Sequence, residues 1–185
     1  MKSHIYLINQ YAILPNGSGG TRHYNLAATL QKQGYDASLV MGSSELNTGK
    51  QSLKGFYLWR SSYVGPVQVV TIKTFPVVGN SIYRILGMIS FSVILFLFLI
   101  SHQLPKPKSI YFSSTPQPFA CLAAYLASCI RRTFFVLEIR DLWPESLFSL
   151  GIMSSKSLIG QLLHHLDLYL VRKSSIVFTL LSNAS

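Results

Sequence analysis

Apolar and polar positions follow two different periods along the chain. Short apolar runs are typical of buried strands and occur at residues 4–9, 37–41, 56–60, 67–73, 108–113, 134–139 and 176–180. Amphipathic stretches with a helical period occupy residues 21–33, 116–130 and about 154–172, and a longer, almost wholly apolar helix is predicted to open at residues 79–81. Strands that alternate with helices predict an α/β fold with a doubly wound, Rossmann-like parallel sheet.

Local signals set several helix boundaries. We expect Thr21 to cap the first helix and Gly34 to end it, since threonine accepts backbone N–H bonds and glycine adopts the left-handed conformation. Pro118 suits the first turn of a later helix, where a missing N–H costs little. Ser154 or Ser155 is expected to cap the last helix. The apolar stripe of that helix consists of Leu158, Ile159, Leu162, Leu163, Leu166 and Leu170.

Length and charge limit the classes of function. The chain of 185 residues suits one domain, residues 1–185. Only 12% of the residues are charged, against roughly 25% in ordinary soluble domains, so some apolar surface is expected to contact something other than water. A net charge of +10 favours phosphorylated substrates or anionic lipid. The cations are scattered and no base-stacking motif occurs, which argues against a nucleic-acid partner.

Residues 85–101 form the most hydrophobic segment, and the 21 residues between Arg84 and Lys106 carry no charge. Three arrangements stay open: a buried crossover helix, a helix with one face on the sheet and the other in lipid, and a membrane span of about 20 residues. A span would place the strands before and after it on opposite sides of the bilayer. The excess of cations favours the second arrangement, with the protein held peripherally on a membrane surface.

Cysteine and histidine spacing indicates neither a disulfide nor a metal. Cys121 and Cys129 lie about 12 Å apart along a predicted helix, whereas a disulfide needs Cα atoms within about 7 Å. His164 and His165 lack a third ligand at a metal-binding spacing, so no metal cofactor is expected. The N-terminus has no long apolar leader with a cleavage site, which predicts a cytoplasmic chain.

A glycine-rich loop follows the first predicted strand and precedes a helix. Glycine lets backbone approach a ligand closely, and the N–H groups at a helix start attract phosphate. Gly19, Gly20 and Arg22 are therefore candidate phosphate-binding residues, although a plain tight turn would use the same glycines. The loop matches neither the dinucleotide-binding fingerprint nor a Walker A loop.

The stretch from Arg140 to Glu145 is the most informative in the chain. It places the carboxylates of Asp141 and Glu145, a guanidinium and the indole of Trp143 directly after a buried strand. Paired carboxylates with a cation can orient sugar hydroxyls or accept a proton, and an indole offers a flat face to a sugar ring or prenyl chain. The structural alternative is an Arg140–carboxylate pair, with Trp143 in the core and Asp141 as a helix cap.

A second polar turn precedes the helix that begins near Pro118. Its side chains, which include Ser114 and Gln117, could hydrogen-bond a ligand or form a helix-capping turn. In doubly wound sheets, ligands bind at the carboxyl ends of the strands, where this turn, the glycine loop and the Arg140–Glu145 stretch are all expected.

Taken together, the motifs resemble a known family. The residues that carry the resemblance are Asn9 and Tyr11, Gly19-Gly20 with Arg22-His23-Tyr24 and Leu26-Ala27, Gly79-Asn80, Ser113-Ser114 with Pro116 and Pro118, and Glu138 with Arg140 to Ser146. This pattern is similar to the N-terminal domain of GT-B-fold, family-4-type glycosyltransferases, in the bacterial branch that builds O-antigen, capsule and colanic-acid-like polysaccharides. The Arg-Asp-Leu-Trp-Pro-Glu-Ser stretch is its specific part, and the glycine pair is unspecific.

The resemblance implies a retaining, metal-independent transfer from a nucleotide-sugar to an acceptor, often a polyprenyl-diphosphate-linked saccharide at the cytoplasmic face of the inner membrane. It implies that Gly19, Gly20 and Arg22 approach the donor diphosphate, and that Asp141 lies near the reacting sugar as a catalytic residue. The acceptor side would be formed by Ser114, Gln117, Glu138, Arg140, Trp143 and Glu145. Gln117 stands where relatives often have histidine.

The donor-binding domain of such enzymes, with its paired-glutamate motif, is not recognisable in this sequence. Because transfer needs both reactants fixed in one geometry, which is worth roughly 7–11 kcal/mol of barrier, the chain alone is expected to be inactive. It would then need a donor-domain partner chain. The alternatives are a non-catalytic acceptor-binding subunit, a truncated remnant, and a small nucleotide-binding module with unrelated chemistry.

Overall fold

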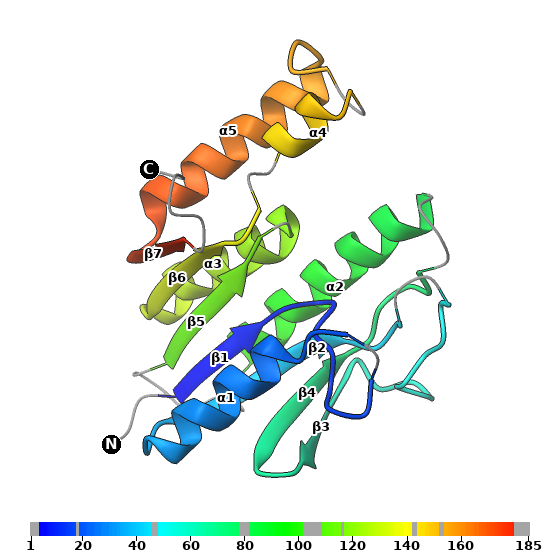
Figure 1. Ribbon diagram of the computed structural model, residues 1–185, viewed down its shortest axis with the longest axis vertical. Coiled ribbons are helices and arrows are strands. Elements are labelled where there is room, and N and C mark those ends of the chain that lie inside the picture. The colour runs from blue at the N-terminus through cyan, green and yellow to red at the C-terminus, as the bar shows by residue number, and fades with distance from the viewer. Residues whose placement is uncertain are drawn as a thin grey trace.

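The computed structural model describes residues 4–17, 19–45, 48–77, 82–101, 109–115, 117–141, 144–151 and 154–179. Its centre is a seven-stranded sheet in the order β3-β4-β2-β1-β5-β6-β7, flanked by helices (Figure 1). Every strand pair is parallel except the hairpin of β3 and β4. The predicted α/β fold with a Rossmann-like, mostly parallel sheet is therefore confirmed.

The strands and helices alternate as the hydrophobic pattern predicts. The strands are β1 (His4–Ile8), β2 (Asp36–Gly42), β3 (Trp59–Val64), β4 (Val67–Ile72), β5 (Ser109–Ser114), β6 (Phe134–Ile139) and β7 (Ile176–Thr179). The helices are α1 (Arg22–Lys32), α2 (Ile82–Ile100), α3 (Pro118–Arg131), α4 (Glu145–Ser149) and α5 (Leu158–Lys173).

Helices cover both faces of the sheet, and successive strand residues point to opposite sides. On one face, Tyr6 and Ile8 of β1 join a core cluster with α2, α3 and α5. On the other face, Leu7 joins a smaller cluster with Ala27 of α1. Parallel strands covered on both sides need continuous apolar runs, which explains why β1 and β2 are apolar at nearly every position.

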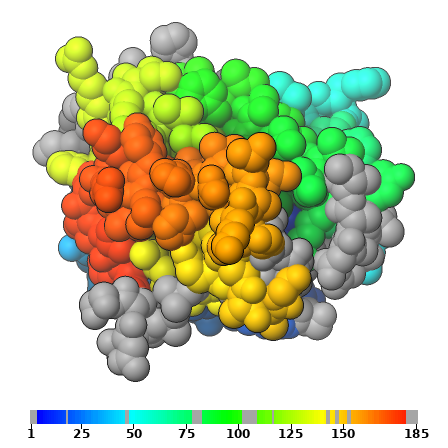
Figure 2. Space-filling model, turned by 90° about the horizontal axis from the view of Figure 1, so that it is seen from above, coloured from blue at the N-terminus to red at the C-terminus, as the bar shows by residue number. Residues whose placement is uncertain are grey.

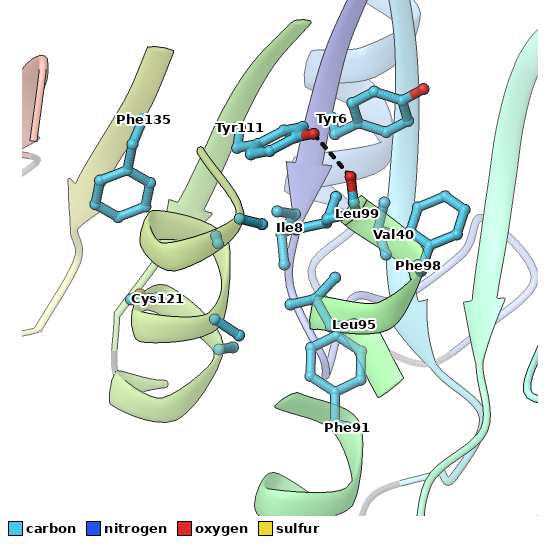
Figure 3. Close-up of a cluster of buried hydrophobic side chains, with 14 of the residues drawn as sticks. Tyr6, Ile8, Val40, Phe91, Leu95, Phe98, Leu99, Tyr111, Cys121 and Phe135 are labelled. Carbon is cyan, nitrogen blue, oxygen red and sulfur yellow. Dashed lines mark hydrogen bonds between the residues drawn. The ribbon is translucent and has the colours of Figure 1, made fainter. Parts of the chain in front are cut away.

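The larger core is dominated by aromatic and leucine side chains between α2, α3 and the sheet (Figure 3). Phe91, Leu95 and Leu99 are buried along one side of α2. The hydroxyl of Tyr111 on β5 donates to the Leu99 carbonyl at 3.1 Å, which satisfies a polar group that would otherwise be stranded in the core. This bond fixes the end of α2 against β5.

Helix α2 is a crossover connection with two different faces. It follows β4 and precedes β5, and both strands lie in the same sheet, so the described fold does not place α2 across a bilayer. It is the one helix among the described residues that is long and apolar enough for a span, but only 33% of its Tyr83–Ile100 window is buried. The outward-facing apolar side chains are Ile85, Leu86, Ile89, Val93 and Leu97. The fully buried arrangement is therefore wrong for this helix.

Several local expectations need correction. The apolar segment at residues 56–60 is mostly a loop, and β3 begins only at Trp59, because β3 pairs as an antiparallel edge with β4. Thr21 precedes α1 but its side chain makes no capping bond, whereas Gly34 has a φ of 88° as expected for a helix stop. Ser157, rather than Ser154 or Ser155, caps α5 by accepting from the Gly160 N–H at 3.1 Å.

The apolar stripe predicted for the last helix is only half buried. Leu163 and Leu170 pack inward, and Leu166 contacts the core from its edge. Leu158, Ile159 and Leu162 are exposed. The helical period identifies a common face, but it does not say how far along the helix a neighbour covers that face.

Candidate functional site

The carboxyl ends of β1, β5 and β6 meet at one edge of the sheet, where α1 and α3 begin. Polar side chains gather there although they are buried: Asn9, His23, Ser114, Gln117 and Glu138. Polar groups in such a dry position are stable only when they are hydrogen-bonded to one another. This edge is the candidate site.

Glu138, at the end of β6, is the anionic centre of the site and only 1% exposed. Its Oε1 pairs with Arg22 Nη2 at 2.5 Å, and its Oε2 accepts from the Ser114 hydroxyl at 2.6 Å. Burial raises the pKa of Glu138, but hydrogen bonds from His23, Arg22 and Ser114 and the charge of Arg22 outweigh it and lower the pKa to about 2. Glu138 is therefore ionised at any physiological pH.

The remaining polar groups form a one-way relay of hydrogen bonds that ends on Glu138. Gln117 Nε2 donates to Asn9 Oδ1 at 3.1 Å, and the Asn9 amide reaches His23 Nδ1 at 3.3 Å. His23 Nε2 lies 2.9 Å from Ser114 Oγ, which donates onward to Glu138. These bonds are mutually consistent when His23 carries its proton on Nε2. The relay fixes the start of α1 against β5 and β6.

Arg22 connects the buried relay to the surface. Its side chain is 39% exposed, and its Nη1 is buried without a hydrogen-bond partner among the described residues. A guanidinium at a helix N-terminus, where backbone N–H groups also point outward, is suited to bind an anionic oxygen. The partly exposed guanidinium of Arg22 is therefore a candidate phosphate-binding group, and the ion pair with Glu138 holds it in place.

The glycine loop contains two glycines with different constraints. Gly19 has a φ of 132°, and a Cβ added there would lie 2.5 Å from Ile13 Cδ1, so the loop itself requires glycine. Gly20 has an ordinary φ, and a Cβ there would meet nothing within 4 Å. The tight-turn explanation accounts for Gly19 but gives no reason for Gly20.

A pocket of about 560 Å³ opens beside the relay, between the loop after β1 and the segment after β2. Its walls include Tyr11, Leu14, Asn16, Ser43, Lys50 and Gln51. The Ser43 hydroxyl donates to Gln51 Oε1, and Gln51 Nε2 donates to the Thr74 carbonyl, so these groups brace the wall. Gln10 joins the pocket to the relay, since its N–H donates to Gln117 Oε1 at 3.0 Å. A pocket of this size, lined by both apolar and polar side chains, could hold a small organic ligand.

The turn after β6 lies next to the turn after β5. The Arg140 N–H donates to Thr115 Oγ1 at 3.0 Å, and the Thr115 N–H donates to the Glu138 carbonyl at 2.9 Å. Asp141 is exposed at this edge and Arg140 is partly exposed. Trp143 lies outside the described residues. The Arg22–Glu138 pair places the glycine loop and the turn after β6 at one edge, as the sequence predicted.

Glu145 lies farther out, on α4. Its Oε1 is 2.8 Å from His164 Nδ1 on α5, and both side chains are exposed. Burial and the nearby charge of Glu145 raise the pKa of Asp167 to about 6, although His164 opposes the shift. The structure thus joins Glu145 to α5 and not to the relay. The ion pairs of the described residues do not include Arg140, so the alternative Arg140–carboxylate pair finds no support there.

Three of the predicted acceptor-binding residues have a different position in the structure than expected. Ser114, Gln117 and Glu138 were expected to contact the acceptor, but they are buried and hydrogen-bonded within the relay, Ser114 to Glu138 and Gln117 to Asn9. They therefore support the surface groups above them. Asn9 and His23 carry part of the family resemblance but have no assigned role in the predicted site, although a polar residue directly after a buried strand was a usable signal for Asn9. Within the described ranges, no group of three or more His, Cys, Asp or Glu side chains is placed to hold a metal ion.

The predicted state of the two cysteines is consistent with the structure, in which both Cys121 and Cys129 are free thiols. Burial raises the pKa of Cys121 to about 12, so this thiol is protonated and unreactive. No protein-family model matches the chain, and no curated protein matches it. The function of the chain is therefore inferred from its motifs and from the geometry of this edge of the sheet.

Proposed function

We propose that this chain forms the acceptor-side domain of a retaining, metal-independent glycosyltransferase of the GT-B type, in the branch that builds cell-surface polysaccharides. The donor would be a nucleotide-sugar and the acceptor a polyprenyl-diphosphate-linked saccharide at the cytoplasmic face of the membrane. The observation that carries the proposal is the meeting of three features at one sheet edge: the partly exposed guanidinium of Arg22, the 560 Å³ pocket and the exposed carboxylate of Asp141.

Each feature has a separate task in this proposal. The backbone at Gly20 and the guanidinium of Arg22 bind diphosphate oxygens, because both present N–H donors beside a helix N-terminus. The pocket holds the acceptor sugar. Asp141 lies near the reacting sugar, where a carboxylate can orient a hydroxyl or accept its proton. The buried relay positions Arg22 and does not contact the substrate.

Binding of the acceptor is the direct test. A short-chain polyprenyl-diphosphate saccharide should raise the thermal midpoint of the purified chain, since a ligand at 100 times its Kd adds about 2.7 kcal/mol. Gly20→Ala should weaken the shift by placing a methyl group where the diphosphate approaches, and Asp141→Asn should weaken it through lost hydrogen bonding. Asp36→Asn, an exposed acid at the opposite edge of the sheet, is the control and should leave the shift unchanged.

The proposal assigns donor activation to a second domain. Residues 1–185 alone should therefore bind the acceptor without transferring a sugar, because both reactants must be held in one geometry. A thermal shift with free nucleotides but none with lipid-diphosphate saccharides would favour the nucleotide-binding module. Sugar transfer by the purified chain would contradict the division of tasks between two domains.

A further inference from the structure

Helices α2 and α3 lie side by side and expose a continuous apolar surface. They pack against each other more extensively than any other pair of elements, and Figure 2 shows green α2 beside lime-green α3 along one side of the molecule. Val93 on α2 is 55% exposed and Ile130 on α3 is 62% exposed. We call the outward side of these two helices the α2–α3 face. Its exposed apolar side chains are Ile85, Leu86, Ile89, Val93, Leu97, Leu126 and Ile130.

A groove of about 280 Å³ runs between the two helices on this face. Its walls include Ile89, Val93 and Phe96 of α2 and Phe119, Leu122 and Leu126 of α3. Ser92 is the one hydroxyl residue in the lining, and its hydroxyl donates to the Met88 carbonyl at 2.8 Å. The groove therefore offers a ligand hydrocarbon contact and no free donor among these residues.

The segment of the chain that contains α2 and α3 carries charges of a single sign. No Asp or Glu occurs between Glu45 and Glu138, whereas this segment contains nine Lys and Arg residues. Arg84 lies in the first turn of α2, and Arg131 and Arg132 lie at the end of α3. Arg131 is buried and its Nη1 donates to the Ser101 carbonyl at 3.1 Å, so the charges of these helices that reach the surface are those of Arg84 and Arg132. An apolar surface with cations at both ends and no acid complements an anionic lipid bilayer.

We propose that the α2–α3 face lies flat on an anionic bilayer, with both helix axes parallel to the membrane plane and a lipid hydrocarbon chain in the groove. This arrangement adds α3 and the groove to the membrane contact expected of residues 85–101. It agrees with the sheet topology, because α2 remains on the same side of the bilayer as β4 and β5.

The α2–α3 face adjoins the candidate site through one contact. The Arg84 guanidinium lies 5.8 Å from the centroid of the Tyr11 ring, and Tyr11 lines the 560 Å³ pocket. A lipid in the groove whose diphosphate reached Arg84 would therefore present its sugar to the pocket. This last step rests on the proposed function, whereas the membrane contact is carried by the apolar face and its charges.

Vesicle flotation of the whole chain tests the inference without any sugar or nucleotide. The chain should float with mixed phosphatidylcholine–phosphatidylglycerol vesicles and bind pure phosphatidylcholine more weakly, since each Lys or Arg near an anionic surface adds about fivefold. Concentrated salt should reduce binding, because the Debye length falls from about 10 Å at 0.1 M to about 3 Å at 1 M. Val93→Asp should weaken binding about tenfold.

The matched control is Thr29→Asp, which makes the same change in net charge at an exposed position of α1, on the opposite face of the sheet. Leu97→Trp provides a second measurement, because its added fluorescence should shift to the blue when anionic vesicles are present. Equal flotation of Val93→Asp and Thr29→Asp would overturn the inference. The inference would also be overturned if the chain bound no vesicles and instead formed a dimer that Val93→Asp dissociates. A chain that neither salt nor alkali extracts from membranes would contradict it as well. None of these outcomes bears on acceptor binding at the pocket.

Discussion

Two regions of this molecule depart from the usual distribution of side chains: one buries polar groups, and the other exposes apolar groups. At the carboxyl edge of the sheet, the carboxylate, imidazole, amide and hydroxyl groups of the relay are buried. On the α2–α3 face, branched apolar side chains are exposed. The first region satisfies each of its polar groups internally, since every member of the relay has a partner. The second has no internal partner for its exposed surface.

This difference indicates that the relay positions other residues, whereas the α2–α3 face binds another phase or molecule. A buried, fully paired network costs desolvation but specifies one geometry, so we expect it to hold Arg22 and not to move. An exposed apolar surface of this extent on a soluble domain is unfavourable unless another phase or molecule covers it. Substitutions in the relay should therefore affect folding, whereas substitutions on the α2–α3 face should affect association.

Glu138→Ala should have the largest effect on stability. It removes the centre of a buried charge network and leaves Arg22, His23 and Ser114 without their acceptor, which typically costs roughly 3–5 kcal/mol. Urea unfolding monitored by circular dichroism would measure the loss. Glu45→Ala, at an exposed acid, is the control and should stay within about 0.5 kcal/mol. A near-neutral Glu138→Ala would mean that the relay does not stabilise the fold.

The two sides of α2 should respond very differently to shortening. Leu95→Ala removes a fully buried side chain from the core shown in Figure 3 and should cost roughly 2–4 kcal/mol. Val93→Ala, two residues away but exposed, should cost less than about 1 kcal/mol. Thermal denaturation in solution compares the two variants directly. Similar losses would show that the α2–α3 face is covered in solution, for instance by self-association.

Acid should unfold the chain through the relay. Because the folded-state pKa of Glu138 is lowered to about 2 from an ordinary 4.5, its stabilisation is complete above pH 4.5 and is lost as the pH falls toward 2, by roughly 3 kcal/mol in total. Asp167 acts in the opposite direction: its raised pKa of about 6 makes the fold gain stability as the pH falls from 6 toward 3.8.

Stability should therefore pass through a maximum at about pH 4, where the two ranges overlap. Urea titrations across this pH range would locate it. Glu138→Gln should remove the acid limb, and Asp167→Asn should remove the gain between pH 6 and 3.8. An unchanged acid limb in Glu138→Gln would assign acid unfolding to another carboxylate.

Substitutions of Gly19 and Gly20 should have the smallest effects on folding. Comparing them distinguishes a purely structural turn from a ligand-binding loop. Gly19→Ala should destabilise the chain by about 1–2 kcal/mol, because an L side chain is strained at a φ of 132°. Gly20→Ala should change stability by less than about 0.5 kcal/mol, since its Cβ meets nothing. Thermal melts of both variants provide the comparison. A large destabilisation by Gly20→Ala would favour the purely structural explanation of this loop.

The sequence by itself determined the fold class, because strand and helix periods are local properties of the chain. The apolar runs located β1, β2, β5 and β6, and glycine marked the end of α1. It also predicted that the glycine loop, the turn with Ser114 and Gln117 and the stretch after β6 lie at one edge, because the carboxyl ends of parallel strands meet there. The family resemblance, and not the strand pattern, brought in Glu138. The short helix α4 was missed because its five residues complete barely one turn and give no periodic signal.

Only the tertiary structure decided which of these groups are buried and which remain exposed. Glu138 and Arg140 are two positions apart in the sequence, but Glu138 is buried and Arg140 is partly exposed. The difference arises because Glu138 contacts Arg22 of α1 at the sheet edge. The same holds for α2, where composition could not distinguish a core helix from a surface one. The burial of a side chain depends on neighbouring elements that are distant in sequence. The hydrophobic pattern of a helix does not say how much of that helix those elements cover.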